Sequence, residues 1–229
     1  MPLSYRVERT CNRHSRAVYK DDEIVIRLAQ GLTHTEEHNH IVGLVQRMQH
    51  MVERDRKRRR IDPFRPLLEE MSVLEIETMN SNVHTFALVA GDRTKAIWNG
   101  QNCTLHIEPR TNQQRLHRTL WKALSQKYKA TITEHVFLWN DRMFRTRPAD
   151  VRVRAASSQW GSCSPRDVLT INPALLFVPT HLLDYVIVHE LAHREHHNHS
   201  RQFWSLVERT YPQYVAARRA LRAYKLPQV

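Results

Sequence analysis

The chain is poor in the features that mark secreted and membrane proteins. Its three cysteines, Cys11, Cys103 and Cys163, lie far apart and form no Cys-x-x-Cys pair. An odd and sparse set of cysteines argues against a disulfide framework and favours a reducing compartment. No stretch approaches the ~18 consecutive apolar residues of a membrane span, and the N-terminus has no apolar signal region. We therefore expect a cytoplasmic protein without a membrane partner.

Acidic residues are also scarce relative to basic ones. The chain has 35 Lys and Arg against 23 Asp and Glu, which gives a net charge of +12. A basic surface favours polyanionic partners, and the run Arg54–Arg60 is a candidate phosphate-binding patch. The same run is also typical of a solvated helix end or linker. No nucleic-acid recognition motif accompanies it, so nucleic acid as a possible partner rests on charge alone.

Low complexity and internal repeats are absent, and 41% of the 229 residues are hydrophobic, enough for a folded core. Apolar spacing predicts strands in the first 30 residues and a helix over residues 36–58, stopped by prolines. Three further apolar runs, with Asn99-Gly100 as a hairpin turn between two of them, predict a β-rich segment. We expect residues 1–110 to form a β-rich section with one helix, packed with residues 111–229 into one compact unit.

The C-terminal section begins with a long helical pattern over residues 112–143, which the β-branched residues 131–133 interrupt. Strands are predicted for "VRVRA" and "VLTIN", joined by the turn-rich link "SSQWGSCSPRD". A helix with Thr180 as its N-cap follows, and it is apolar around nearly its whole circumference. Such a helix is buried, so polar side chains within it need partners.

Two histidines and a glutamate lie within that buried helix. His189 and His193 are four residues apart, so both rings project from one helical face and can bind one zinc ion. Glu190, beside the first histidine, is placed to take a proton from a water molecule at the metal. This His-Glu-x-x-His pattern is typical of metal-dependent hydrolases.

A catalytic zinc site needs a third protein ligand. His197 continues the spacing, but on a straight helix it lies about 12 Å from His189 along the axis, too far to share one ion. The ligand must therefore follow a turn, and we place that turn at Asn198, which tolerates the left-handed conformation. His199 comes directly after it, and Ser200 can cap the next helix. His199 is the preferred third ligand, and Glu208 is the alternative.

Four motifs, "WGSCS" at 160–164, "HELAH" at 189–193, "NHS" at 198–200 and "FW" at 203–204, together resemble the YgjP-like zinc metallopeptidases. These belong to the zincin clan and are related to SprT-type and Wss-type proteases. The resemblance implies an α+β zincin-like fold, with a small mixed sheet above a buried active-site helix. It also implies one Zn²⁺ on His189, His193 and His199, with Glu190 as the catalytic base. Ser158-Gln159 departs from the basic pair that the family often has before "WGSC".

The predicted activity is hydrolysis of peptide bonds in a polypeptide substrate, by a water molecule activated at the metal. An aminopeptidase or a non-peptide amidase is a variant of the same chemistry. The competing class is a nucleic-acid-binding protein with a structural zinc site, in which all four metal positions are filled. The sequence does not identify a donor for the oxyanion. Trp160, Tyr211 and Tyr214 are candidates that also fit packing roles, and Cys163 is expected to be a structural thiol.

Overall fold

The computed structural model describes residues 3–69 and 71–229, with the side chain of Asn80 left undescribed. By their contacts, the residues divide into two compact units, 1–59 and 60–229. The boundary that we expected near residue 110 falls inside the second unit, and one hydrophobic core contains residues from both sides of it. The division into a β-rich section with one helix (1–110) and a zincin-like metallopeptidase section (111–229) stays a prediction.

The first unit packs one helix on a three-stranded sheet. Its elements are β1 (Tyr5–Arg9), β2 (Arg16–Lys20), β3 (Glu23–Leu28) and α1 (His34–Arg56). The central strand β3 pairs in parallel with β1 and antiparallel with β2. Alternate residues of β3, namely Ile24, Ile26 and Leu28, are fully buried in a core that includes Met48 of α1. The sequence prediction of two strands and a helix here is confirmed, and β2 is additional.

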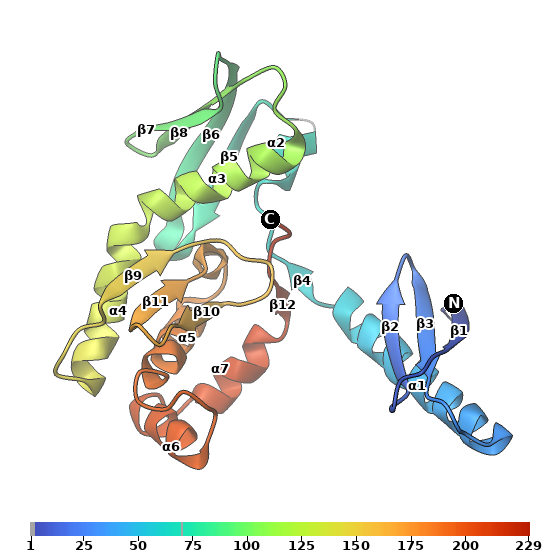
Figure 1. Ribbon diagram of the computed structural model, residues 1–229. Coiled ribbons are helices and arrows are strands. Elements are labelled where there is room, and N and C mark those ends of the chain that lie inside the picture. Colours follow the sequence, from blue (N-terminus) through green and yellow to red (C-terminus); the bar gives the residue numbers. More distant parts are fainter. Residues whose placement is uncertain (1–2, 70) are drawn as a thin grey trace. The chain divides into compact units, whose positions relative to one another are not determined.

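The second unit begins with a four-stranded sheet that α3 crosses (Figure 1). Strand β4 (Arg59–Arg60) spans the boundary between the units, and the elements that follow it are α2 (Arg65–Glu69), β5 (Val73–Thr78), a 3-10 turn (Met79–Ser81), β6 (Asn82–Ala90), β7 (Lys95–Asn99), β8 (Asn102–Ile107) and α3 (Gln113–Lys127). The strand order is β5-β6-β8-β7. The Asn99-Gly100 hairpin is confirmed, and Gly100 has a φ of 59°, which a glycine adopts without strain.

The long helical pattern is split into α3 and α4 (Lys129–Met143) at Tyr128. The predicted interruption at residues 131–133 is therefore wrong, because those residues lie inside α4. Tyr128 is buried, and its hydroxyl is held by His84 Nε2 at 2.7 Å and by Thr78. These contacts come from the four-stranded sheet, and helical periodicity alone does not reveal them.

A smaller three-stranded sheet and four helical segments complete the second unit. They are β9 (Asp150–Val153), β10 (Gly161–Cys163), β11 (Val168–Ile171), a 3-10 turn (Pro173–Phe177), α5 (Thr180–Ala192), α6 (Arg201–Thr210), α7 (Tyr214–Leu221) and β12 (Tyr224–Lys225). The strand order is β10-β11-β9, with β10 antiparallel and β9 parallel to β11. Strand β12 pairs with β4. Strand β10 lies within the segment that the sequence predicted as a link.

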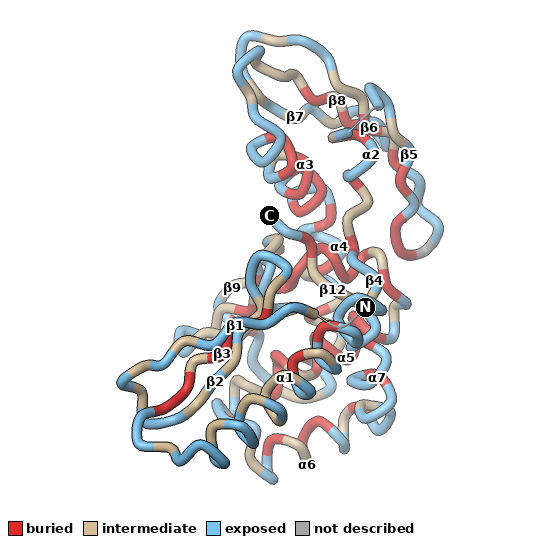
Figure 2. The backbone as a smooth tube through the Cα atoms, turned by 90° about the vertical axis from the view of Figure 1, so that its right-hand side faces the viewer, coloured by how far each residue is buried: buried red, intermediate tan, exposed pale blue. Residues whose placement is uncertain are grey.

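Helix α5 is the most deeply buried helix of this part, and Figure 2 shows its tube mainly in the colour of buried residues. Nine of its 13 residues are buried, as the all-round apolar pattern predicted. The N-cap position is Pro179 rather than Thr180, which is the first helical residue, and no side chain caps this end. No helix in the described part of the chain combines the length and apolarity needed to cross a membrane. The α+β class is confirmed.

Candidate active site

The end of α5 places two of the three histidines. Helix α5 ends at Ala192, and His193 is its C-cap, where the backbone tightens. The His193 N–H donates to the Glu190 carbonyl at 3.2 Å, and the Arg194 N–H donates to Leu191 at 3.0 Å. The chain therefore turns directly after His193, and the expected left-handed turn at Asn198 is wrong, since Asn198 has no positive φ. The early turn lets a third side chain return within six residues.

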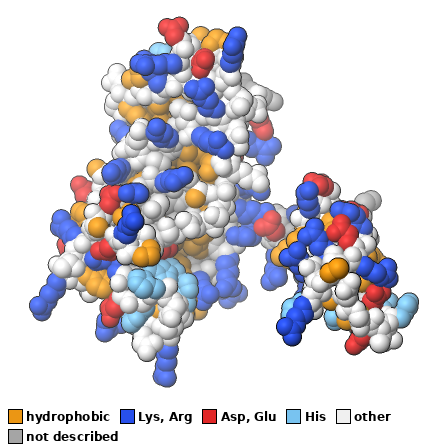
Figure 3. Space-filling view, viewed as in Figure 1, with side chains coloured by type: hydrophobic (Ala, Val, Ile, Leu, Met, Phe, Trp, Pro, Cys, Tyr) orange, Lys and Arg blue, Asp and Glu red, His pale blue; other side chains and the backbone are white. Residues whose placement is uncertain are grey.

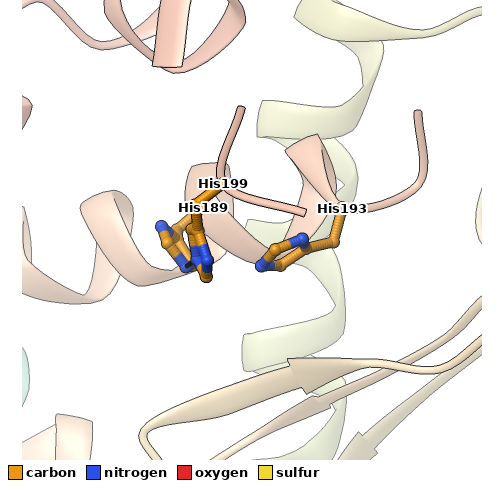
Figure 4. A group of neighbouring side chains, drawn as sticks. All are labelled: His189, His193 and His199. Carbon is orange, nitrogen blue, oxygen red and sulfur yellow. Dashed lines mark hydrogen bonds between the residues drawn. The ribbon is translucent and has the colours of Figure 1, made fainter. Parts of the chain in front are cut away.

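His199 is the side chain that returns to the first two. It precedes Ser200, whose hydroxyl accepts the Phe203 N–H at 3.3 Å and caps α6, as the sequence predicted. Its Nε2 lies 3.1 Å from Nε2 of His189. One nitrogen from each of His189, His193 and His199 lies within 4.8 Å of the other two. Figure 4 shows the three rings gathered at the end of α5.

The hydrogen bonding and burial of these rings leave lone pairs available. The His193 Nδ1–H donates to the His196 carbonyl at 3.0 Å, because a carbonyl can only accept, so its Nε2 stays unprotonated. Burial lowers the pKa of His189 to about 3 and also lowers that of His193. His189 Nδ1 is buried and, among the described residues, has no hydrogen-bond partner. Imidazole nitrogens that converge in this way fit a metal ion, since metal ligation requires unprotonated nitrogen.

Aromatic side chains of α6 hold the three histidines together. Phe203 is fully buried, and its ring centroid lies 4.9, 4.6 and 4.8 Å from those of His189, His193 and His199. Trp204 stacks on His199 with 5.6 Å between centroids. These contacts fix the orientation of the rings before any ligand arrives, which lowers the entropic cost of binding.

Glu190 points to the small sheet and is 7% exposed. Burial raises the pKa of its carboxyl group to about 8. Its side chain packs against the backbone of β10 at Gly161, where an added Cβ would lie 2.7 Å from Glu190 Cγ and 2.9 Å from Oε1. Glycine at position 161 therefore leaves the space that Glu190 occupies.

Gly161→Ala should displace Glu190 and weaken the protein. Over-packing of this kind costs about 1–3 kcal/mol of stability. Thermal unfolding measures this loss. Gly43→Ala is the matched control, because an added Cβ would meet no described atom within 4 Å apart from its chain neighbours and its own helix backbone, and alanine favours a helix. Gly43→Ala should be neutral or stabilising, and equal effects of the two changes would contradict the packing argument.

Glu190 also predicts a pH dependence of stability in the metal-free protein. The carboxyl pKa is 4.5 in its ordinary state and about 8 when folded. Between these values the unfolded chain has lost a proton that the folded protein keeps, so stability falls as pH rises, by up to ~1.4 kcal/mol per pH unit. Denaturant unfolding from about pH 5 to about pH 8 should show Glu190→Gln gaining stability over the wild type. Parallel pH profiles for the two proteins would contradict a buried carboxyl with a raised pKa.

An open strand edge borders the histidines. Among the described residues, strand β10 pairs only with β11. Just beyond the two ends of β10, the Trp160 carbonyl accepts from the Asn172 N–H and the Ser164 N–H donates to the Val168 carbonyl. Because backbone groups alternate in direction along an antiparallel strand, those of Gly161 and Cys163 point to the unpaired edge. A cleft of about 420 Å³ runs along this edge, lined by residues of β10, the three histidines, Glu190, Pro165 and His197. An extended chain could lie in this cleft beside the histidines.

Arg194 anchors the turn after His193, a role that was not predicted from the sequence. Its side chain is 9% exposed and makes two bonds to the Asp167 carboxylate, at 2.6 and 2.8 Å. It also donates to Asn140 Oδ1 and to the Thr146 carbonyl. Arg194 thus joins the end of α5 to α4 and to the turn after β10. The only sequence signal was an arginine next to the motif, and its partners lie 27 to 54 residues away.

The remaining candidates lie outside the group of three histidines. Glu208 is exposed on α6 and does not line the cleft. Tyr211 is buried, and its hydroxyl donates to the His181 carbonyl at 3.0 Å, while Tyr214 stacks on Trp204. Trp160 packs against the core, as a structural residue does. Cys163 lines the cleft, but burial raises the pKa of its thiol to about 11, which disfavours the reactive thiolate.

Comparison with known proteins adds a family to this geometry. No curated protein matches the chain. A crystal structure of the metallopeptidase zymogen abylysin from Pyrococcus abyssi is similar at 26% identity, over 39% of this chain and 91% of that one, with a TM-score of 0.36. The sequence matches the family described as "YgjP-like, metallopeptidase domain" over residues 13–224. The match spans nearly the whole chain, and the chain therefore belongs to the YgjP-like metallopeptidase family.

Proposed function

We propose that the protein is a zinc-dependent peptidase with a zincin-type arrangement of small sheet, cleft and active-site helix. One zinc ion would be held by His189, His193 and His199, and Glu190 would be the catalytic base. The observation that carries the proposal is the convergence of three histidine nitrogens within 4.8 Å, in one cleft with a buried carboxyl group. Nitrogen ligands in this number suit a catalytic zinc, which keeps a further position for a water molecule or substrate.

When bound, zinc would act as a Lewis acid toward the substrate carbonyl and would lower the pKa of water in the cleft. Glu190 would take a proton from water as the water oxygen bonds to the carbonyl carbon. The same carboxyl would then give the proton to the leaving amine as the C–N bond breaks. Burial favours this role, because it raises the proton affinity of the carboxylate toward the range of a base that works near neutral pH.

The open edge of β10 supports an extended polypeptide as the substrate. Strand addition would pair the substrate backbone with the outward groups of Gly161 and Cys163, and would lay a peptide bond beside the histidines. Recognition through the backbone tolerates many side chains. A free-amine requirement would mark an aminopeptidase, and cleavage of non-peptide amides would mark an amidase, so substrates of both kinds belong in the assay.

A structural zinc in a nucleic-acid-binding protein is the alternative. The cleft in front of the three histidines supports catalysis, since a structural site closes around its metal. In the part of the chain that the structure describes, no other histidine, cysteine or acidic side chain joins the group. Nucleic acid as a partner remains a prediction from charge, centred on Arg54–Arg60.

Removal and return of the metal tests the proposal. Purified protein should hydrolyse members of a mixed peptide library, read by mass spectrometry, and a chelator should remove the activity. Addition of about one equivalent of Zn²⁺ should restore the activity, whereas a purely structural zinc would restore folding without hydrolysis. Circular dichroism at each step distinguishes recovery of the fold from recovery of hydrolysis. Hydrolysis that persists after complete metal removal, or no hydrolysis with metal bound, would refute the proposed function.

A further inference from the structure

A second concave surface lies away from the histidines, within the same unit. It has a volume of about 580 Å³ and lies between α3 and the segment that follows β9. Its walls include three basic residues, Arg118, Lys122 and Arg154, two half-buried apolar residues, Val153 and Ala155, and Val229, the last residue of the sequence. We call it the basic pocket.

The three basic side chains of the basic pocket come from two segments of the second unit. Arg118 and Lys122 are one helical turn apart on α3, so both side chains lie on one face. Arg154 follows β9, and its backbone N–H is fixed to the Ile171 carbonyl at 3.1 Å. None of these three side chains has an ion-pair partner among residues 3–69 and 71–229. Three unpaired cations around apolar walls suit a ligand that is both anionic and apolar.

The basic pocket is tied to the cleft by a short and ordered stretch of chain. Gly161 in the cleft wall comes six positions after Ala155 in the pocket wall, a span of at most about 20 Å. The side chain of Asn172 donates to the carbonyls of Ala156 and Gln159, at 2.8 and 3.0 Å, and fixes this stretch. Figure 3 shows apolar surface flanked by Lys and Arg on the face that also carries a group of histidines.

We propose that the basic pocket is a remote subsite for the polypeptide substrate, which binds a carboxylate next to an apolar side chain. The inference rests on the proposed function and adds a substrate class to it. An extended peptide of about seven residues spans the distance from cleft to pocket. The carboxylate could belong to an acidic side chain or to the C-terminus of the substrate. Apolar walls beside the cations favour a peptide over nucleic acid, whose phosphates need cations spaced along a track.

Peptide binding to the zinc-loaded Glu190→Gln protein tests the subsite without hydrolysis. Three fluorescein-labelled 12-residue peptides differ only in one internal residue and in the chemistry of the C-terminus. The first has an internal Glu-Leu and an amidated end. The second has Gln-Leu and an amidated end, and the third has Gln-Leu and a free terminal carboxylate. Fluorescence anisotropy should show at least about 10-fold tighter binding for the first or third peptide than for the second. Whichever peptide binds more tightly than the second identifies the source of the carboxylate. Equal affinity for all three would overturn the proposal.

Variants that remove positive charge show which residues cause the tighter binding of the carboxylate peptide. Arg118→Gln with Lys122→Gln should remove the advantage of the carboxylate peptide and leave the Gln-Leu amide unchanged. Lys129→Gln with Arg219→Gln removes the same charge from other exposed sites of the second unit and should keep the advantage. Circular dichroism confirms that both double variants are folded. Equal losses in the two would mean general electrostatic attraction and would overturn the subsite.

Two further outcomes separate this inference from its alternatives. If Arg118→Gln with Lys122→Gln weakens binding of a single-stranded oligonucleotide and not of the peptides, the pocket is a nucleic-acid site and the proposal fails. If the wild type cleaves peptides but shows no preference for a carboxylate, the subsite fails and the proposed function stands. If the preference is found but no peptide is cleaved, the subsite stands and the proposed function fails.

Discussion

Glu190→Gln should lose nearly all peptide hydrolysis while it keeps its fold and its metal. The amide has nearly the same size as the carboxyl group and fits beside Gly161, but it cannot accept the proton of the attacking water molecule. General-base catalysis contributes about 100- to 10,000-fold, so kcat should fall by that factor while KM changes little. Steady-state hydrolysis of a library-derived peptide measures the fall, and metal analysis of the same sample measures zinc content.

Glu195→Gln is the matched control for this experiment. It makes the same chemical change five residues further along the chain, at an exposed side chain whose contact is with His196 at 3.7 Å. Its activity should stay within about twofold of the wild type, because exposed ion pairs contribute little. Activity of Glu190→Gln equal to that of the control would refute the assignment of Glu190 as the base.

His193→Ala should reduce bound zinc from about one equivalent to nearly none. Loss of one of three protein ligands removes much of the binding free energy, and the two remaining rings gain no replacement from the neighbouring described groups. Zinc content after dialysis against a weak chelator, measured by atomic emission, gives the stoichiometry. His181→Ala, an exposed histidine at the start of α5, is the control and should keep its zinc.

The third ligand can be identified in the same assay. His199→Ala should lose zinc as His193→Ala does, because its Nε2 lies 3.1 Å from that of His189. Glu208→Gln should retain zinc, since its exposed side chain lies outside the cleft. Zinc retained by His199→Ala and lost by Glu208→Gln would reverse the choice between the two. Full zinc content in all of the histidine variants would remove the proposed site altogether.

The sequence predicted the features of this protein that depend on neighbours along the chain. Histidines four residues apart in a helix must share a face, so the pairing of His189 with His193 followed from spacing alone. The buried α5, the Asn99-Gly100 hairpin and the Ser200 cap followed from local patterns in the same way. The rejection of His197 as a ligand assumed a helix that continues past His193, and the structure instead ends α5 at Ala192.

Tertiary structure decided how distant segments meet. The short link that becomes β10 has no periodicity of its own, and pairing with β11 makes it a strand. The fit of Gly161 against Glu190 and the Arg194–Asp167 pair join residues 27 or more positions apart. Such contacts depend on packing of whole elements, which local propensity does not encode. The sequence alone therefore determined which residues could hold a metal and act as a base, and only the fold placed them in a cleft with an open strand edge.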